Sequence, residues 1–208
     1  VTDIDDTIKV TGVPGETGNV LRNTFCRDFV AAPGMPDSYK RIADVPFHYV
    51  SGGPWQLYGP LYDFLISGSG GYPEGTFHFN DFPKNILDKD TRAILVQTLA
   101  GSLERTYQHK VKRITELMER FPDRKFILSG DSGEVDPEVY RLVKEKYPRK
   151  VQEIWIRDVV NDAVVNPDRL RGMKIIKSEP VICATESHYQ KISAMLKKLN
   201  RPSYNRNR

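Results

Sequence analysis

Cysteine is scarce in this 208-residue sequence, which contains two, Cys26 and Cys183, far apart in the chain. Two cysteines so placed make neither a disulfide framework nor a zinc-binding set, and such sparse usage fits a reducing compartment. The four histidines form no HExxH pairing, so zinc-dependent hydrolysis has no basis in the sequence. No apolar run approaches the ~20 residues needed to cross a bilayer, and we expect any membrane contact to be peripheral.

The remaining composition is ordinary, but the charge is unevenly distributed. Hydrophobic residues make up 39% and charged residues 28% of the chain, which excludes a disordered or collagen-like protein. The formal net charge is +4, and we expect no nucleic-acid partner. Residues 186–208 are expected to form a basic C-terminal helix and tail, which either lies against anionic lipid or is simply solvated. Its basic residues are Lys191, Lys197, Lys198, Arg201, Arg206 and Arg208.

Strand-like apolar runs alternate with periodic helix-like segments, which predicts an α/β fold with a mostly parallel sheet flanked by helices. A helix that begins at Pro54 is expected to be interrupted at Gly59-Pro60, and Asp136 is expected to cap another. The predicted strands are 46–51, 76–82, 125–129, 151–159 and 181–184. The predicted helices are 61–66, one that ends near Phe121-Pro122, one that starts at Asp136-Pro137, and 186–199.

The first predicted strand is short, because only Val1 and Thr2 precede the acidic stretch DIDDT. A typical strand has about five residues, and we therefore expect the natural protein to extend upstream. We interpret 1–208 as a single domain.

Asp3 and Asp5 stand two residues apart at the end of this strand, the edge where open parallel sheets bind ligands. Three clustered carboxylates repel one another, and a hard divalent cation such as Mg²⁺ relieves that repulsion. One carboxylate can attack phosphorus, and a second can protonate the leaving oxygen and then activate water. The alternative is an acidic loop with an Asx-turn.

Three later segments add groups suited to a phosphate. Ser51 and Gly52 lie where a strand runs into a glycine turn, which fits a phosphate cradle or an ordinary helix cap. Lys110, with Lys112 as its rival, belongs to an amphipathic helix and can offset phosphate charge or simply be solvated. Asp131 and Asp136 in GDSGEVD follow the strand KFILS and can ligate a metal, although Asp136 can equally serve as a helix cap.

The order of these segments resembles the haloacid dehalogenase superfamily. DIDDT matches its first motif, Ser51 its second, Lys110 its third, and GDSGEVD its fourth. More narrowly, DIDDTIKVTGV, FHYVSGGPWQLY, RKFILSGDSGEVDPEVY and IWIRDV resemble the catalytic domain of the actin-patch-associated, magnesium-dependent phosphatidate phosphatases. The closer resemblance runs from Val1 to about Val159.

The resemblance implies a haloacid-dehalogenase-like Rossmannoid domain with a small or absent cap, a role for each motif residue, and Mg²⁺ as cofactor. Asp3 would be nucleophile and metal ligand, and Asp5 the general acid/base and a ligand through its backbone carbonyl. Thr7 would orient the loop, and Ser51, Gly52 and Lys110 would hold the phosphoryl group. Asp131 and Asp136 would complete the metal site. Phosphatidate or related lipid phosphates would be hydrolysed by a cytoplasmic enzyme, peripheral at an anionic membrane surface.

Two other functions stay open. The same chemistry serves a phosphatase of soluble phosphate monoesters. A phospho-accepting signalling module also uses an aspartate, a hydroxyl residue and a lysine, but it needs neither Asp5 nor GDSGEVD. Trp55, Tyr58 and Tyr62 follow the second motif and either meet a lipid interface or pack in the core.

Overall fold

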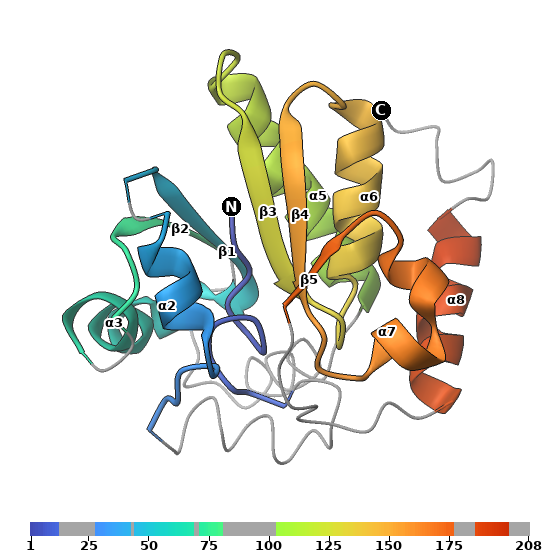
Figure 1. Cartoon of the computed structure of the whole chain (residues 1–208), viewed down its shortest axis with the longest axis horizontal. Helices are drawn as coiled ribbons and strands as arrows, with labels where there is room; N and C mark the ends of the chain where they lie inside the picture. Colours follow the sequence, from blue (N-terminus) through green and yellow to red (C-terminus); the bar gives the residue numbers. More distant parts are fainter. Residues whose placement is uncertain (13–27, 43, 69–70, 81–102, 177–185, 200–208) are drawn as a thin grey trace.

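A parallel sheet forms the centre of the computed structural model (Figure 1), which describes residues 1–12, 28–42, 44–68, 71–80, 103–176 and 186–199. Residues 1–3 lie between two groups of paired strands, so that the spatial order is β2, β1, residues 1–3, β3, β4, β5. All of these pairings are parallel. The strands are β1 (Phe47–Pro54), β2 (Gly75–Asn80), β3 (Phe126–Asp131), β4 (Val151–Arg157) and β5 (Lys174–Ile176).

Residues 1–3 join the two groups through backbone hydrogen bonds on both sides. The Thr2 amide donates to the carbonyl of His48 at 2.9 Å, and the Val50 amide donates to the carbonyl of Thr2 at 2.8 Å. On the other side, the Asp3 amide donates to the carbonyl of Ser129 at 2.9 Å. Asp3 is therefore held between β1 and β3 at the carboxyl edge of the sheet.

Helices cover both faces of the sheet. On one face, α5 (Leu103–Arg120) contacts β1, and α6 (Asp136–Lys146) contacts β3 and β4. On the other face lie α2 (Met35–Lys40) and α3 (Tyr58–Tyr62). Side chains alternate between the two cores along β4, where Ile154 and Ile156 face one core and Trp155 the other. This confirms the predicted α/β fold with a parallel sheet flanked by helices.

Two local predictions were wrong. Pro54 ends β1 and is the N-cap of a short 3-10 helix (Trp55–Leu57), so the expected helical start is displaced by one residue, and α3 runs through Gly59 and Pro60 instead of breaking there. Pro60 is tolerated because it occupies the first turn of α3, where its missing N–H has no partner within the helix. The N-cap of α6 is Val135, and Asp136 is the first helical residue, whose carboxylate is engaged elsewhere.

Other predictions were confirmed or fall outside the described residues. The amphipathic helix is α5, and the last helix is α8 (Glu186–Leu199), as expected. β5 was not predicted from the sequence. The predicted strand 181–184, the tail 200–208, and the segments 13–27 and 81–102, on which the size of a cap depends, lie outside the described residues.

A cavity of about 520 Å³ lies at the amino edge of the sheet, where Val1, Phe47 and Phe126 contribute to its lining. The cavity is at the opposite end of the strands from Asp3, Asp131 and Asp136. None of the described helices is long and apolar enough to span a bilayer.

Candidate active site

The predicted site residues come from separate elements that meet at the carboxyl edge of the sheet. Asp3 ends the short segment between β1 and β3, and Asp131 is the last residue of β3. Asp136 opens α6, and Lys110 projects from α5. Because the carboxyl ends of parallel strands share one edge, residues more than a hundred positions apart come together here.

The Lys110 ammonium lies among three carboxylates. Its Nζ is 2.8 Å from Asp3 Oδ1, 2.6 Å from Asp136 Oδ1 and 3.2 Å from Glu134 Oε2, and its side chain is only 1% exposed. Burial alone would lower the pKa of Lys110, but the attraction of Asp136, Asp3 and Glu134 outweighs burial and raises that pKa well above its usual value. Lys110 is therefore a permanent cation beside Asp3.

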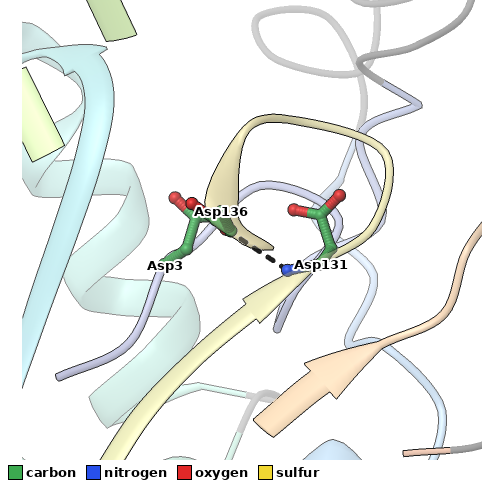
Figure 2. Close-up of side chains that lie close together, drawn as sticks. All are labelled: Asp3, Asp131 and Asp136. Carbon is green, nitrogen blue, oxygen red and sulfur yellow. Dashed lines mark hydrogen bonds between the residues drawn. The ribbon is translucent and has the colours of Figure 1, made fainter. Parts of the chain in front are cut away.

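Asp3, Asp131 and Asp136 form a buried group in which one carboxylate oxygen of each lies within 4.8 Å of the others (Figure 2). Burial, with the like charge of neighbouring carboxylates, raises the pKa of Asp3 and of Asp131 well above the usual value. The Thr7 hydroxyl lies between them, donating to Asp3 Oδ2 at 3.1 Å and Asp131 Oδ2 at 3.4 Å.

The chemistry of this group fits a hard divalent cation. The ammonium contacts Asp3, Asp136 and Glu134, and the carboxylate of Asp131 lies beside them, so negative charge remains in excess. Within the described residues, Asp131 forms no ion pair, and its carboxylate accepts only from Thr7 and backbone amides. Buried oxygen ligands carrying excess negative charge are what Mg²⁺ and Ca²⁺ bind in proteins.

Gly130 allows the closest approach in the site. The Asp131 amide donates to Asp136 Oδ2 at 3.2 Å, the bond drawn in Figure 2. A Cβ on Gly130 would lie 2.3 Å from that oxygen and 2.6 Å from Asp136 Cβ. Only glycine leaves room for the Asp136 carboxylate to reach both the β3 backbone and Lys110.

Asp5 has a different environment from Asp3. Its carboxylate lies outside the three-aspartate group and is 3.0 Å from Lys9 Nζ, while Thr11 Oγ1 donates to it at 2.7 Å. Burial would raise the pKa of Asp5, but Lys9 and Thr11 outweigh burial and lower it. Ser51 Oγ approaches the other Asp5 oxygen at 3.4 Å, so Asp5 faces the second motif.

Ser51 and Gly52 lie at the same edge. Ser51 is buried, and its Oγ accepts a hydrogen bond of 3.0 Å from the Gly53 amide, so this amide is already engaged. Gly52 allows β1 to pack closely against α5, because a Cβ at this position would lie only 3.3 Å from Thr106 Oγ1 of that helix.

Sequence reasoning missed two charged neighbours. Lys9 is buried and pairs with Asp5, and the only sequence signal was its spacing of four residues. Glu134 lies within GDSGEVD, but nothing in that pattern marked it as a partner of Lys110.

The fold and this cluster define a parallel α/β domain with a buried lysine–carboxylate site, suited to a divalent cation, at the carboxyl edge of its sheet. The family model of the catalytic domain of phosphatidate phosphatase APP1 matches residues 1–158. The chain therefore belongs to this family.

Two curated relatives agree with this assignment. The chain is 33% identical over 162 residues to a protein of Saccharomyces cerevisiae named phosphatidate phosphatase APP1. The aligned residues cover 76% of this chain and 25% of the relative. It is 27% identical over 168 residues to an uncharacterized protein of Schizosaccharomyces pombe, with 78% and 25% covered. The chain thus spans about a quarter of the length of these relatives. No solved structure matches it significantly.

The Gly130→Ala substitution tests the packing of the site. The added methyl would force Asp136 away from the β3 backbone, and we expect a loss of about 1–3 kcal/mol in the free energy of unfolding, measured by urea denaturation. Gly59→Ala is the matched control, because no atom lies within 4 Å of its Cβ position, and it should leave stability unchanged or slightly higher. Equal stability of the Gly130→Ala and native proteins would contradict the geometry.

Proposed function

We propose that this chain is a Mg²⁺-dependent phosphatase that hydrolyses phosphatidate through an aspartyl-phosphate formed on Asp3. The observation that carries the proposal is the 2.8 Å contact between Lys110 Nζ and Asp3 Oδ1 in a buried acidic site. Phosphoryl transfer needs a nucleophile, an acid/base, a cation and metal carboxylates at one place. Family membership and the name of the S. cerevisiae relative supply the lipid substrate.

In the first step, a carboxylate oxygen of Asp3 attacks phosphorus and the bond to the leaving alkoxide breaks. Lys110 offsets charge on the phosphoryl oxygens, aided by Ser51 and the backbone at Gly52. Thr7 holds Asp3 Oδ2 and fixes the direction of attack. Asp5 donates a proton to the leaving oxygen, and diacylglycerol departs.

In the second step, water attacks phosphorus and releases Asp3 and inorganic phosphate. Asp5, now a carboxylate, takes the proton from that water. The lowered pKa of Asp5, caused by Lys9 and Thr11, favours this basic form. A dianionic phosphate that binds beside Asp5 raises that pKa by repulsion, which favours the acid form needed for the first step.

Asp3, Asp131 and Asp136 would hold Mg²⁺, with the Asp5 backbone carbonyl as a further ligand. The excess of buried carboxylates over Lys110 is the reason to expect the ion. When bound, Mg²⁺ supplies positive charge to phosphoryl oxygens and keeps Asp3 ionised despite its raised pKa.

We propose a peripheral position on an anionic membrane surface, consistent with a cytoplasmic enzyme. Trp55 directly follows β1 and Tyr58 opens α3. These residues are 44% and 42% exposed, and their ring centroids lie 6.2 Å apart. Trp55 also packs edge-on against Phe79, so the pair is partly anchored in the core. Aromatic side chains with one apolar and one wet side suit a lipid interface.

The Asp3→Asn substitution tests the nucleophile. We expect phosphate release from phosphatidate in mixed micelles with Mg²⁺ to fall on the order of 10⁴-fold or more. The melting temperature should be unchanged or higher, because burial raises the pKa of Asp3 and an uncharged amide removes one of several repelling carboxylates. An active Asp3→Asn protein would end the proposal.

The Asp5→Asn substitution separates the two steps. A substrate with an activated leaving group does not need the acid, so the phosphoenzyme should still form in a rapid quench. Its hydrolysis should slow about 10²–10⁴-fold, because no base takes the proton of the attacking water. Native-like decay of the phosphoenzyme would remove Asp5 from this role. Stable phosphate on the native protein would instead favour a signalling module.

Substrate class is tested by comparing phosphatidate with small phosphate esters under the same Mg²⁺ concentration. We expect kcat/KM to favour phosphatidate micelles, and we expect Trp55→Ala to raise KM for micelles while leaving hydrolysis of soluble esters unchanged. Equal kcat/KM for both substrates, together with no effect of Trp55→Ala, would identify a phosphatase of soluble monoesters.

A further inference from the structure

Arg169 lies beyond the residues that the family model matches, yet its guanidinium reaches the loop that carries the acidic group. This loop, called here the metal loop, runs from Asp131 to Asp136. Arg169 donates hydrogen bonds to the backbone carbonyls of Ser132 and Glu134 within it. We propose that Arg169 is a positioning residue that sets the metal loop in the geometry in which Asp131 and Asp136 bind Mg²⁺, an inference that rests on the proposed function.

The Arg169 guanidinium is held firmly on its other side. Nε donates to Glu138 Oε1 at 2.7 Å and Nη2 to Glu138 Oε2 at 3.0 Å, which makes a two-pronged pair with α6. Nη1 also pairs with Asp162 of α7 (Asp162–Val165). The Arg169 side chain is 5% exposed. A planar group fixed by two buried carboxylates cannot swing, so the carbonyls it contacts are fixed as well.

Backbone amides of the metal loop donate hydrogen bonds to the carboxylate of Asp131, at the start of the same loop. Asp131 Oδ1 accepts hydrogen bonds from the amides of Gly133 at 2.6 Å and Glu134 at 3.1 Å. Asp131 therefore holds the amides of the loop, and Arg169 holds its carbonyls. Rotation of these peptide planes would change the orientation of the Asp131 carboxylate and move Glu134 relative to Lys110.

A second contact ties the same loop to the C-terminal part of the chain. Ser132 Oγ donates to Asp158 Oδ1 at 2.8 Å, and Asp158 accepts from the amides of Asp162 at 2.8 Å and Ala163 at 2.9 Å. The Tyr189 hydroxyl of α8 donates to Asp162 Oδ1 at 2.6 Å. A continuous polar network thus runs from α8 through α7 to the metal loop, at the β5 end of the sheet (Figure 1).

Arg169→Lys is the informative variant. It keeps a positive charge for Glu138 and Asp162, but a lysine ammonium cannot serve two carboxylates and two carbonyls in one plane. Arg171→Lys is the matched control, because Arg171 is 78% exposed and its ion-pair partner is the exposed Asp168.

The decisive measurement is Mg²⁺ binding by calorimetry on the whole chain without substrate. We expect about tenfold weaker binding in Arg169→Lys and no change in Arg171→Lys, because mutating a residue that orients metal ligands typically lowers metal affinity by about 10–100-fold. The Mg²⁺ concentration for half-maximal activity should rise equally, with kcat restored at saturating Mg²⁺. If Arg169 only stabilised the fold, kcat of Arg169→Lys would stay low even at saturating Mg²⁺. Binding of Mg²⁺ by Arg169→Lys within twofold of the native protein overturns the proposal.

Hydrogen exchange makes the test independent of metal and activity. The amides of Gly133 and Glu134 should exchange at least about tenfold faster in Arg169→Lys, while those of α5 stay unchanged. If the native protein binds no Mg²⁺, the proposed metal is wrong, and unchanged exchange at these two amides still overturns the positioning role. If Arg169→Lys does not fold, Glu138→Gln replaces it, because it loosens the same guanidinium. Faster exchange at the Gly133 and Glu134 amides would then support the positioning role, and unchanged exchange would overturn it.

Discussion

The site depends on one buried ammonium ion placed among carboxylates that would otherwise repel one another. Lys110 contacts Asp3 in the N-terminal segment and both Glu134 and Asp136 in the metal loop, more than a hundred positions away in the chain. Removing this ammonium would leave several buried carboxylates without a counter-charge, and an uncompensated buried charge typically costs about 3–5 kcal/mol. The packing of α5 against β1 is therefore a condition of the site, because it delivers Lys110 to the edge of the sheet.

Asp3 and Asp5 each lie beside a buried lysine, but their pKa values are shifted in opposite directions. Burial raises the pKa of Asp3 well above its usual value even though Lys110 is adjacent, whereas Lys9 and Thr11 lower the pKa of Asp5. Pairs of carboxylates whose pKa values are pushed apart are typical of sites that divide nucleophilic and proton-transfer work. The proposed function requires bound ligands to shift both pKa values: a cation beside Asp3 would lower its pKa and keep it ionised, and a dianionic phosphate beside Asp5 would raise its pKa.

The meeting of Asp3, Lys110, Asp131 and Asp136 was predictable from the sequence, because strand-end residues of a parallel sheet share one edge and helical periodicity located α5. The same rules could not predict Lys9, since a lysine four residues from an aspartate is common on surfaces. At Asp136 only the expected cap of α6 was wrong. Its carboxylate instead accepts hydrogen bonds from Lys110, a partner that was also anticipated, and from the Asp131 amide.

The C-terminal part of the chain gave no motif, and the family model ends at residue 158, yet the polar network does not end there. Glu138 and Ser132, both before that boundary, find partners in Arg169 and Asp158, and Asp158 in turn is satisfied by amides of α7. A domain ended at 158 would deprive the Glu138 carboxylate of Arg169 and the Asp158 carboxylate of the α7 amides, and burying unpaired charge is among the costliest defects in a fold. The chemistry of the metal loop thus favours counting residues 159–176 and α8 as part of the same folding unit, even though no sequence motif in them points to the site.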